Sequence, residues 1–343
     1  MASALDRLSY TARQAARVAW YAGHYAAGRR LMKPMPKPGH PIGPTPDRKE
    51  MTADMRALFQ REWRDIADGL FPAPRPLAPE PAEFLRRSFL YFRDLPKVDA
   101  RRHGHLDDEL PPGEQGDGLP TYYRQNFHFQ TDGWLSEHSA ALYDTQVEVL
   151  FTGAADVMRR RALRPIAEWI SGRNQRVLRG LDVGCGTGRL LAAVHEAWPG
   201  LKLAGLDLSA PYLAEARRLV GQTARVKLIE GAAEKLPFDD RSLDLVFSSF
   251  LMHELPHDVR REVLREMARV VKPDGLVVIV DSLQKGDHPA WDGLLDLFPH
   301  YFHEPYYAEF TNGRLADWAH DAGLAVRGSE RAFLSQVTAL TLR

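Results

Sequence analysis

The run Leu181-Asp182-Val183-Gly184-Cys185-Gly186-Thr187-Gly188-Arg189-Leu190-Leu191 decides the fold of this chain. Apolar residues before the loop predict a short buried strand over 177–183, and the pattern after it predicts a helix over 189–198. Glycine at every second position lets the backbone turn through positive φ and leaves bare main chain against a ligand. Unpaired N–H groups at the start of the helix point into the same crevice. The run therefore predicts a nucleotide-like ligand at the carboxyl end of the first strand of a doubly wound α/β sheet.

The spacing of these glycines narrows the choice of ligand. The dinucleotide fingerprint G-x-G-x-x-G needs its third glycine where Arg189 stands. The loop is instead D-x-G-x-G-x-G, and the acidic Asp182 at its entrance suits a cationic ligand better than a pyrophosphate. This pattern resembles motif I of the class I S-adenosylmethionine (SAM) methyltransferases, which implies SAM as the cofactor. Taken alone, such a loop is equally compatible with an ordinary strand–helix turn.

Further motifs follow in the order that this family shows. Asp207 ends a second predicted strand, where an acid can accept both hydroxyls of a ribose. The stretch 231–238 resembles the adenine-contacting turn G-D-A-x-x-L-P-F, except that Ala232 replaces the acid, so adenine would need another acceptor such as Glu234 or a backbone carbonyl. The run F-D-x-x-S-x-D-x-V begins at Phe238, and the turn V-K-P-D-G ends at Gly275. About half of the chain, from 177 to 343, resembles the family.

The closest resemblance is to the ubiquinone/menaquinone-biosynthesis-like group of small-molecule methyltransferases. It implies a Rossmann-like, seven-stranded, mostly parallel sheet with an antiparallel last hairpin. We expect a SAM-binding methyltransferase domain over 141–343 and a helical N-terminal cap region with proline-rich connectors over 1–140. The cofactor contacts that the resemblance implies are Asp182, Gly184, Cys185, Gly186, Gly188, Asp207, Leu208, Ala232, Ala233, Glu234 and Ser249.

The N-terminal region begins with a predicted helix over 6–31 that is rich in arginine and contains a single acid, Asp6. Three interpretations stay open: a helix packed on its own domain, a basic amphipathic helix in peripheral contact with a membrane, and a cleaved organellar presequence. Further helices are predicted over 52–69, 83–94, 139–158 and 165–170, and a surface loop over 101–118.

Composition bounds the possible partners. Lys+Arg and Asp+Glu number 45 each among 343 residues, so no net charge favours nucleic acid. No apolar run approaches the roughly 18 residues of a membrane span. The single cysteine, Cys185, excludes an internal disulfide and a cysteine-rich zinc site. We expect a cytoplasmic protein with no nucleic-acid partner, and the oligomeric state stays open.

His253 follows the fourth predicted strand, where an acceptor would meet the methyl group of SAM. A histidine there suits a general base, although it can equally be a packing residue. The sequence 253–257 also matches the zinc motif H-E-x-x-H, but Pro256 breaks the helix which that motif requires. His300, His303 and Glu304 could suggest a metal, but their surroundings are aromatic. We therefore predict no metal.

Two aromatic segments, 122–134 and 298–307, are the best candidates for the walls of an acceptor pocket, the alternatives being core packing and a surface helix. The predicted pocket residues are Tyr143, Asp281, Tyr301, His303 and Tyr306. The predicted reaction is methyl transfer from SAM to a small apolar or aromatic acceptor, with O, N or C methylation undecided. The rivals are a SAM-binding protein without transferase activity and a methyltransferase for macromolecules. Ser248-Ser249-Phe250-Leu251 stands where amino-group methyltransferases carry N-P-P-Y, which counts against the second rival.

Overall fold

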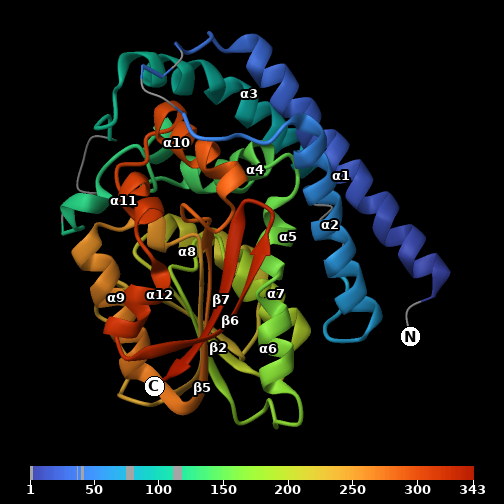
Figure 1. The fold of residues 1–343 in the computed structure, drawn as a ribbon, viewed down its shortest axis with the longest axis vertical. Helices are drawn as coiled ribbons and strands as arrows, with labels where there is room; N and C mark the ends of the chain where they lie inside the picture. The colour runs from blue at the N-terminus through green and yellow to red at the C-terminus, as the bar shows by residue number, and fades with distance from the viewer. Residues whose placement is uncertain (1–2, 37, 40–41, 75–80, 111–117) are drawn as a thin grey trace.

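A seven-stranded sheet forms the lower half of the molecule (Figure 1), in a computed structural model that describes residues 3–36, 38–39, 42–74, 81–110 and 118–343. The strand order is β3-β2-β1-β4-β5-β7-β6. The strands are β1 (Arg179–Val183), β2 (Lys202–Asp207), β3 (Val226–Glu230), β4 (Leu243–Ser249), β5 (Val271–Ser282), β6 (Leu324–Ala332) and β7 (Ser335–Leu342). Strands β1 to β5 are parallel, and β7 runs antiparallel to both β5 and β6. The predicted fold class is confirmed.

Helices cover both faces of the sheet. On one face lie α6 (Leu163–Ile170), α7 (Arg189–Ala197) and α8 (Ala210–Val220), and on the other lie α9 (His257–Val270) and α12 (Leu315–Asp321). Successive residues of a strand point to opposite faces, so Leu245 and Phe247 of β4 enter one core and Val246 enters the other. The central strands are therefore nearly continuous apolar runs.

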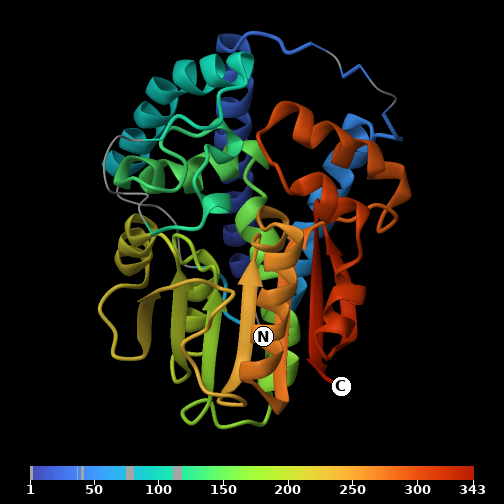
Figure 2. The same cartoon turned by 90° about the vertical axis from the view of Figure 1, so that its left-hand side faces the viewer.

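The N-terminal region is helical, as predicted (Figures 1 and 2). It comprises α1 (Ala4–Leu31), α2 (Arg48–Ala67) and α3 (Pro81–Gly104), and α4 (Glu137–Leu150) and α5 (Ala155–Arg160) continue the helical part beyond residue 140. Helix α2 begins before the predicted residue 52 because Asp47 and Glu50 form a capping box. Helix α3 continues through Pro96 to Gly104, so it covers the start of the predicted loop 101–118, of which 111–117 lie outside the described residues.

The single helix predicted over 139–158 is two helices, α4 and α5. The break contains Thr152 and Gly153, which have positive φ angles of 48° and 88°. A Cβ atom on Gly153 would lie 3.2 Å from the Cα atom of Val18 in α1. The close approach of α1 therefore requires a glycine at the point where the chain turns.

Buried ion pairs join helices α1, α2, α4 and α5 to one another. Arg17 of α1 pairs with Glu148 of α4 and with Asp156 of α5, the latter at 3.3 Å. Arg160 of α5 lies 2.5 Å from Glu62 of α2. Because buried charges are costly unless they are paired, these contacts fix the helices in one arrangement. The boundary between residues 140 and 141 falls inside α4 and stays a prediction.

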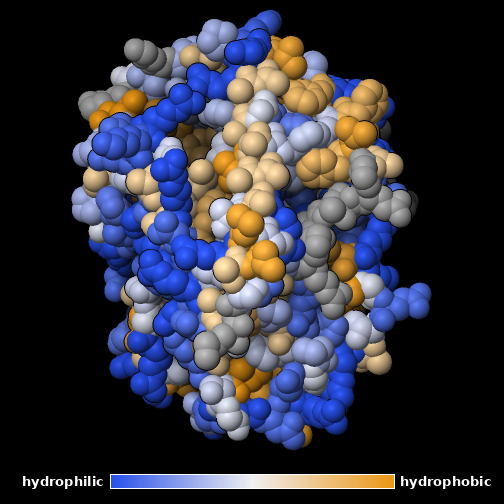
Figure 3. Space-filling model, turned by 90° about the vertical axis from the view of Figure 1, so that its right-hand side faces the viewer, coloured by the Kyte–Doolittle hydropathy of each residue, from blue (hydrophilic) through white to orange (hydrophobic). Residues whose placement is uncertain are grey.

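Two further helices, α10 (Asp292–Tyr301) and α11 (Tyr307–Asn312), stand beside α3 and α4 above the carboxyl ends of the strands (Figure 2). Figure 3 faces the side that bears α1 and α2, where hydrophobic side chains gather mainly in the upper half. Among the residues described, no helix is both long and apolar enough to cross a membrane.

Candidate active site

The glycine loop, residues 184–188, joins the end of β1 to the start of α7. Gly184, Gly186 and Gly188 have φ angles of 66°, 53° and 78°. A Cβ atom on Gly188 would lie 2.9 Å from the Cβ atom of Ala216, and one on Gly184 would lie 2.9 Å from a methyl carbon of Leu251. A Cβ atom on Gly186 would meet only the ring of Tyr212, at 4.0 Å. The loop thus has its open side at Gly186.

Two acids flank the glycine loop. Asp207, at the end of β2, accepts hydrogen bonds from the N–H groups of Gly186 (2.8 Å) and Ser209 (2.9 Å). Asp182, at the end of β1, is 1% exposed, and neither of its carboxylate oxygens has a well-formed hydrogen bond within the described part of the chain. Burial and the charge of Asp207 raise the pKa of Asp182 well above its usual range, and the nearby amide of Leu191 offsets this only in part. A cationic group bound at the loop would compensate such an acid.

The remaining residues of the predicted cofactor site stand at the carboxyl ends of β2, β3 and β4, the same edge of the sheet at which the glycine loop follows β1. Ala232, Ala233 and Glu234 follow β3, Leu208 follows Asp207, and Ser249 ends β4. Both carboxylate oxygens of Glu234 accept from the hydroxyl of Tyr122, at 2.9 and 3.1 Å, so the N-terminal region reaches over this turn. The N–H group of Cys185 donates to Leu206, and its sulfur lies 2.9 Å from where a Cβ atom of Gly205 would stand, so its side chain packs on β2. These features fit SAM, whose ribose, adenine and cationic groups need acceptors beside open main chain.

Two contacts attach α4 to the glycine loop and to α8. Asp144 accepts from the hydroxyl of Thr187 and from Nε of Arg189, both at 2.7 Å. The ring of Tyr143 meets the ring of Tyr212 edge-on, with centroids 5.4 Å apart. Nε2 of Gln130 donates to the hydroxyl of Tyr212 at 3.2 Å. Sequence reasoning missed Tyr212, which stands outside every family motif; Gln130 was signalled only by the dense polar and aromatic residues of 122–134.

An apolar cavity of about 780 Å³ opens beyond Tyr143, bounded by α1, α3, α4, the segment 128–130 and the end of α10. Its lining residues include Tyr25, Met32, Tyr91, Leu95, Val98, His128, Phe129, Gln130, Tyr143, Val147, Leu150, Tyr301 and Phe302. Basic residues Arg29, Arg30, Lys33 and Arg102 also border it, near the end of α1. Of the predicted pocket residues, Tyr143 and Tyr301 are in this lining.

His253 lies in a 3-10 turn, Met252–Glu254, directly after β4. Its Nδ1 atom is 2.5 Å from Oδ1 of Asp281, whose other oxygen accepts from the N–H of Met252 at 2.7 Å. Burial acts to lower the pKa of His253, but Asp281 and Glu254 outweigh it and raise the pKa to about 9. Asp281 therefore lies behind His253 and holds its ring. With this pKa, the imidazole is mostly charged at neutral pH. In the ligand-free protein, His253 is therefore a weaker base than the sequence suggested.

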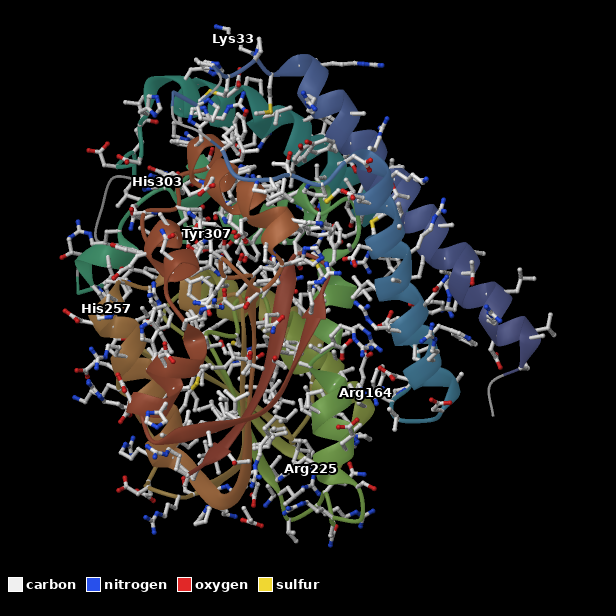
Figure 4. All side chains as sticks on the ribbon, viewed as in Figure 1. Lys33, Arg164, Arg225, His257, His303 and Tyr307 are labelled. Atoms are coloured by element: carbon white, nitrogen blue, oxygen red, sulfur yellow. The ribbon has the colours of Figure 1, made fainter. Side chains whose placement is uncertain are left out.

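The two aromatic segments meet above the sheet. The N–H of His128 donates to the carbonyl of His303 at 3.0 Å, and the ring of His128 stands edge-on to Phe298 and Phe302. His303 itself lies 2.7 Å from Gln125, to which Tyr306 is also joined. Figure 4 shows His303 above Tyr307, farther from the strands. Among the described residues, His303 and Tyr306 support the segment 122–134 and are not part of the cavity lining.

Residues 181–275 match the family model of a methyltransferase domain. A demethylmenaquinone methyltransferase of Chlorobaculum tepidum is 33% identical over 149 residues, which are 43% of this chain and 58% of the relative. A demethylmenaquinone methyltransferase of Geobacillus sp. is 38% identical over 131 residues, which are 37% of this chain and 53% of the relative. The chain thus spans about half the length of the curated relatives it matches.

A solved SAM-dependent methyltransferase of Aquifex aeolicus aligns over 53% of this chain and 89% of its own, at 21% identity and a TM-score of 0.40. The matched domain and the relatives confirm the resemblance to class I SAM-dependent methyltransferases. Within that class they confirm the resemblance to the quinone-biosynthesis group. They also support SAM as the cofactor.

Proposed function

We propose that this protein transfers a methyl group from SAM to a small apolar acceptor of the quinone type. The observation that carries the proposal is the continuity between the glycine loop and the apolar cavity. Gly186 faces Tyr212, Tyr212 contacts Tyr143, and Tyr143 lines the cavity. The relatives named as demethylmenaquinone methyltransferases support a quinone-type ring as the acceptor.

SAM supplies a methyl group that is already activated by its sulfonium centre, so the protein has mainly to bind and align. Asp207 would exchange its two amide donors for the hydroxyls of the ribose, and Asp182 would compensate the positive charge of the ligand. Tyr122 and Glu234 would border the adenine. The N-terminal helices would exclude water from the acceptor, because they form the outer wall of the apolar cavity.

We propose His253 as the catalytic base, with its pKa lowered from about 9 by the positive charge of bound SAM, and Asp281 as a positioning residue that holds its ring. The proposal rests on the position of His253 after β4, beside the rings of Tyr307 and Phe310. His253→Ala should lower turnover about 10²–10⁴-fold while SAM affinity stays nearly unchanged. Full turnover in that variant would remove His253 from catalysis, as expected for an acceptor that is already an anion.

Calorimetric titration with SAM, S-adenosylhomocysteine and NAD tests the cofactor, and transfer of labelled methyl to a panel of quinols and phenols tests the reaction. We expect binding of the first two ligands, far weaker binding of NAD, and label in a small apolar acceptor. Binding without transfer to any acceptor would favour a SAM-binding protein without transferase activity. Label found only in protein or nucleic acid would favour a methyltransferase for macromolecules.

We further propose peripheral membrane contact through the first half of α1, the helix whose last turns line the cavity. Leu5 and Leu8 are 76% and 67% exposed, and Arg7 and Arg13 are exposed beside them. Arg17 cannot take part, because it is paired with Glu148 and Asp156. A cytoplasmic location stays a prediction.

A further inference from the structure

A cluster of one imidazole and two carboxylates lies between the apolar cavity and His253. We name His128, Glu254 and Glu304 the carboxylate cluster. Nε2 of His128 is 2.7 Å from Oε1 of Glu304 and 3.7 Å from Oε1 of Glu254. One ligand atom from each of the three residues lies within 4.8 Å of the others. The three come from separate places: the 3-10 segment Phe127–Phe129, the turn after β4, and the loop between α10 and α11.

The carboxylates of this cluster are buried with too few donors. The side chain of Glu304 is 0% exposed and that of Glu254 is 5% exposed. Although Nε2 of His128 is close, neither oxygen of Glu304 accepts a well-formed hydrogen bond from any described residue, and the same holds for Oε2 of Glu254. Nε2 of His253 is 3.5 Å from Oε1 of Glu254, beyond ordinary hydrogen-bond length. Two acids in one buried site repel each other, and a cation between them would remove that cost.

We infer that the carboxylate cluster binds one divalent transition-metal ion through Nε2 of His128 and one oxygen each of Glu254 and Glu304. An imidazole beside two carboxylates suits Mn²⁺, Fe²⁺ or Zn²⁺, whereas Mg²⁺ and Ca²⁺ prefer oxygen ligands alone. Three protein ligands leave coordination positions open, which is typical of catalytic sites and not of structural ones. The zinc motif at 253–257 is not the source of this site, because His257 pairs with Asp258 at the surface.

The ion would lie at the wall of the apolar cavity, because His128 belongs both to the carboxylate cluster and to the lining of the cavity. An oxygen of the acceptor could then occupy an open position of the ion. A metal ion polarises such an oxygen and lowers the pKa of its hydroxyl. This step rests on the proposed function and narrows the acceptor to compounds that carry a phenolic, enolic or quinol oxygen.

Metal binding can be measured without turnover. Purified protein is freed of metal with a chelator and titrated with Mn²⁺, with free Mn²⁺ followed by electron paramagnetic resonance, and then challenged with Zn²⁺. We expect one Mn²⁺ per chain, displaced by Zn²⁺. Glu304→Gln and Glu254→Gln should each weaken binding by about a hundredfold or more, since each removes a direct ligand. Glu309→Gln, an exposed glutamate in α11, is the matched control and should bind as the unmodified protein does.

SAM affinity measured on the same samples separates the two proposals. An unmodified chain that binds SAM but no Mn²⁺ or Zn²⁺ overturns the metal site and leaves the proposed function intact. An unmodified chain that binds Mn²⁺ but no SAM overturns the proposed function and leaves the metal site intact. In the rival arrangement, the two carboxylates share a proton beside a charged His128. This arrangement predicts that Glu304→Gln raises the Tm of the protein and that neither Mn²⁺ nor Zn²⁺ changes the Tm. That result, or unchanged Mn²⁺ affinity in both glutamine variants, would refute the inference. If neither variant folds, the titration of the unmodified chain decides.

Discussion

The glycine loop and the apolar cavity lie next to each other and are built in opposite ways. The loop consists of consecutive residues between β1 and α7, fixed by their own backbone and by Asp207. The cavity is assembled from α1, α3, α4 and α10, which are far apart in the sequence. Buried ion pairs such as that of Arg17 with Glu148 hold its walls. We therefore expect single substitutions that change the backbone to abolish ligand binding at the loop. The cavity should instead be disrupted by the loss of contacts between helices.

The largest effect is expected from Gly186→Val. Gly186 has a φ of 53°, and its open side is where the ligand would lie, so a branched side chain strains the backbone and blocks the site. Calorimetry should detect no SAM binding. Gly172→Val is the matched control, since Gly172 has a φ of 74° and nothing within 4 Å of its Cβ position. It should lose about 1–2 kcal/mol of stability and keep its SAM affinity. Equal loss of affinity in both variants would mean that strain, and not the ligand, explains the effect.

The second effect concerns the wall of the cavity. Arg17→Met leaves Glu148 and Asp156 buried without their cation and should lower the free energy of unfolding by about 3–5 kcal/mol. Urea unfolding measures this loss, and Arg13→Met, exposed on the same helix, should change stability by no more than about 0.5 kcal/mol. SAM affinity should survive in both, because the glycine loop makes its bonds to Asp207 and Asp144 without Arg17. A parallel loss of SAM affinity would show that loop and cavity form one unit.

The same ion pair predicts an acid dependence. Burial tends to raise the pKa of Asp156, but Arg17, with smaller contributions from Arg189, Arg160 and Arg159, lowers the pKa to about 2. A depressed pKa in the folded state contributes stability above the unfolded value of about 3.9 and loses it as the pH falls toward 2. The unmodified chain should therefore lose stability over that window more steeply than Arg17→Met does.

The difference between loop and cavity also explains what could be predicted from the sequence. Asp182, the three glycines and Asp207 stand in patterns whose spacing reflects their local geometry, and the resemblance carried by these motifs implied the seven-stranded sheet. The contacts of Tyr212 with Tyr143, and of His128 with Glu304, join segments with no fixed spacing between them. Composition indicated that 122–134 forms a wall, but tertiary packing alone determines which side chains meet there.

The third effect returns to the loop. Asp207→Asn keeps the shape of the side chain but removes its charge and replaces one acceptor oxygen with a donor, so the paired ribose contacts are lost. SAM affinity should fall by about 1.5–3 kcal/mol, which is roughly 10-fold to 150-fold. Asp258→Asn, an exposed acid in the first turn of α9, should leave it unchanged. Normal affinity in Asp207→Asn would remove Asp207 from the ribose site.

The fourth effect tests whether the cavity holds the acceptor. Val98 lines the cavity from α3, and Val98→Trp would fill part of it without touching the glycine loop. Turnover of quinols that carry a long apolar chain on the ring should fall by about tenfold. Turnover of analogues with a short chain, and the affinity for SAM, should change little. Phe89→Trp adds a similar ring to the exposed side of the same helix and is the control. If both variants act alike, or if tail length makes no difference, the cavity does not select the acceptor.

The smallest effect concerns the exposed first half of α1, whose last turns line the cavity. Arg13 is exposed, whereas Arg17 is engaged inside, so only the former can meet anionic lipid. Arg13→Gln should weaken co-sedimentation with phosphatidylserine-containing vesicles by about 1 kcal/mol, or roughly fivefold, and rising salt should abolish the difference. Arg265→Gln removes an exposed charge from α9 and should have no effect. If the unmodified chain fails to bind vesicles even at low salt, α1 is a packed wall of the cavity and nothing more. Its exposed leucines then belong to the ordinary apolar share of a protein surface.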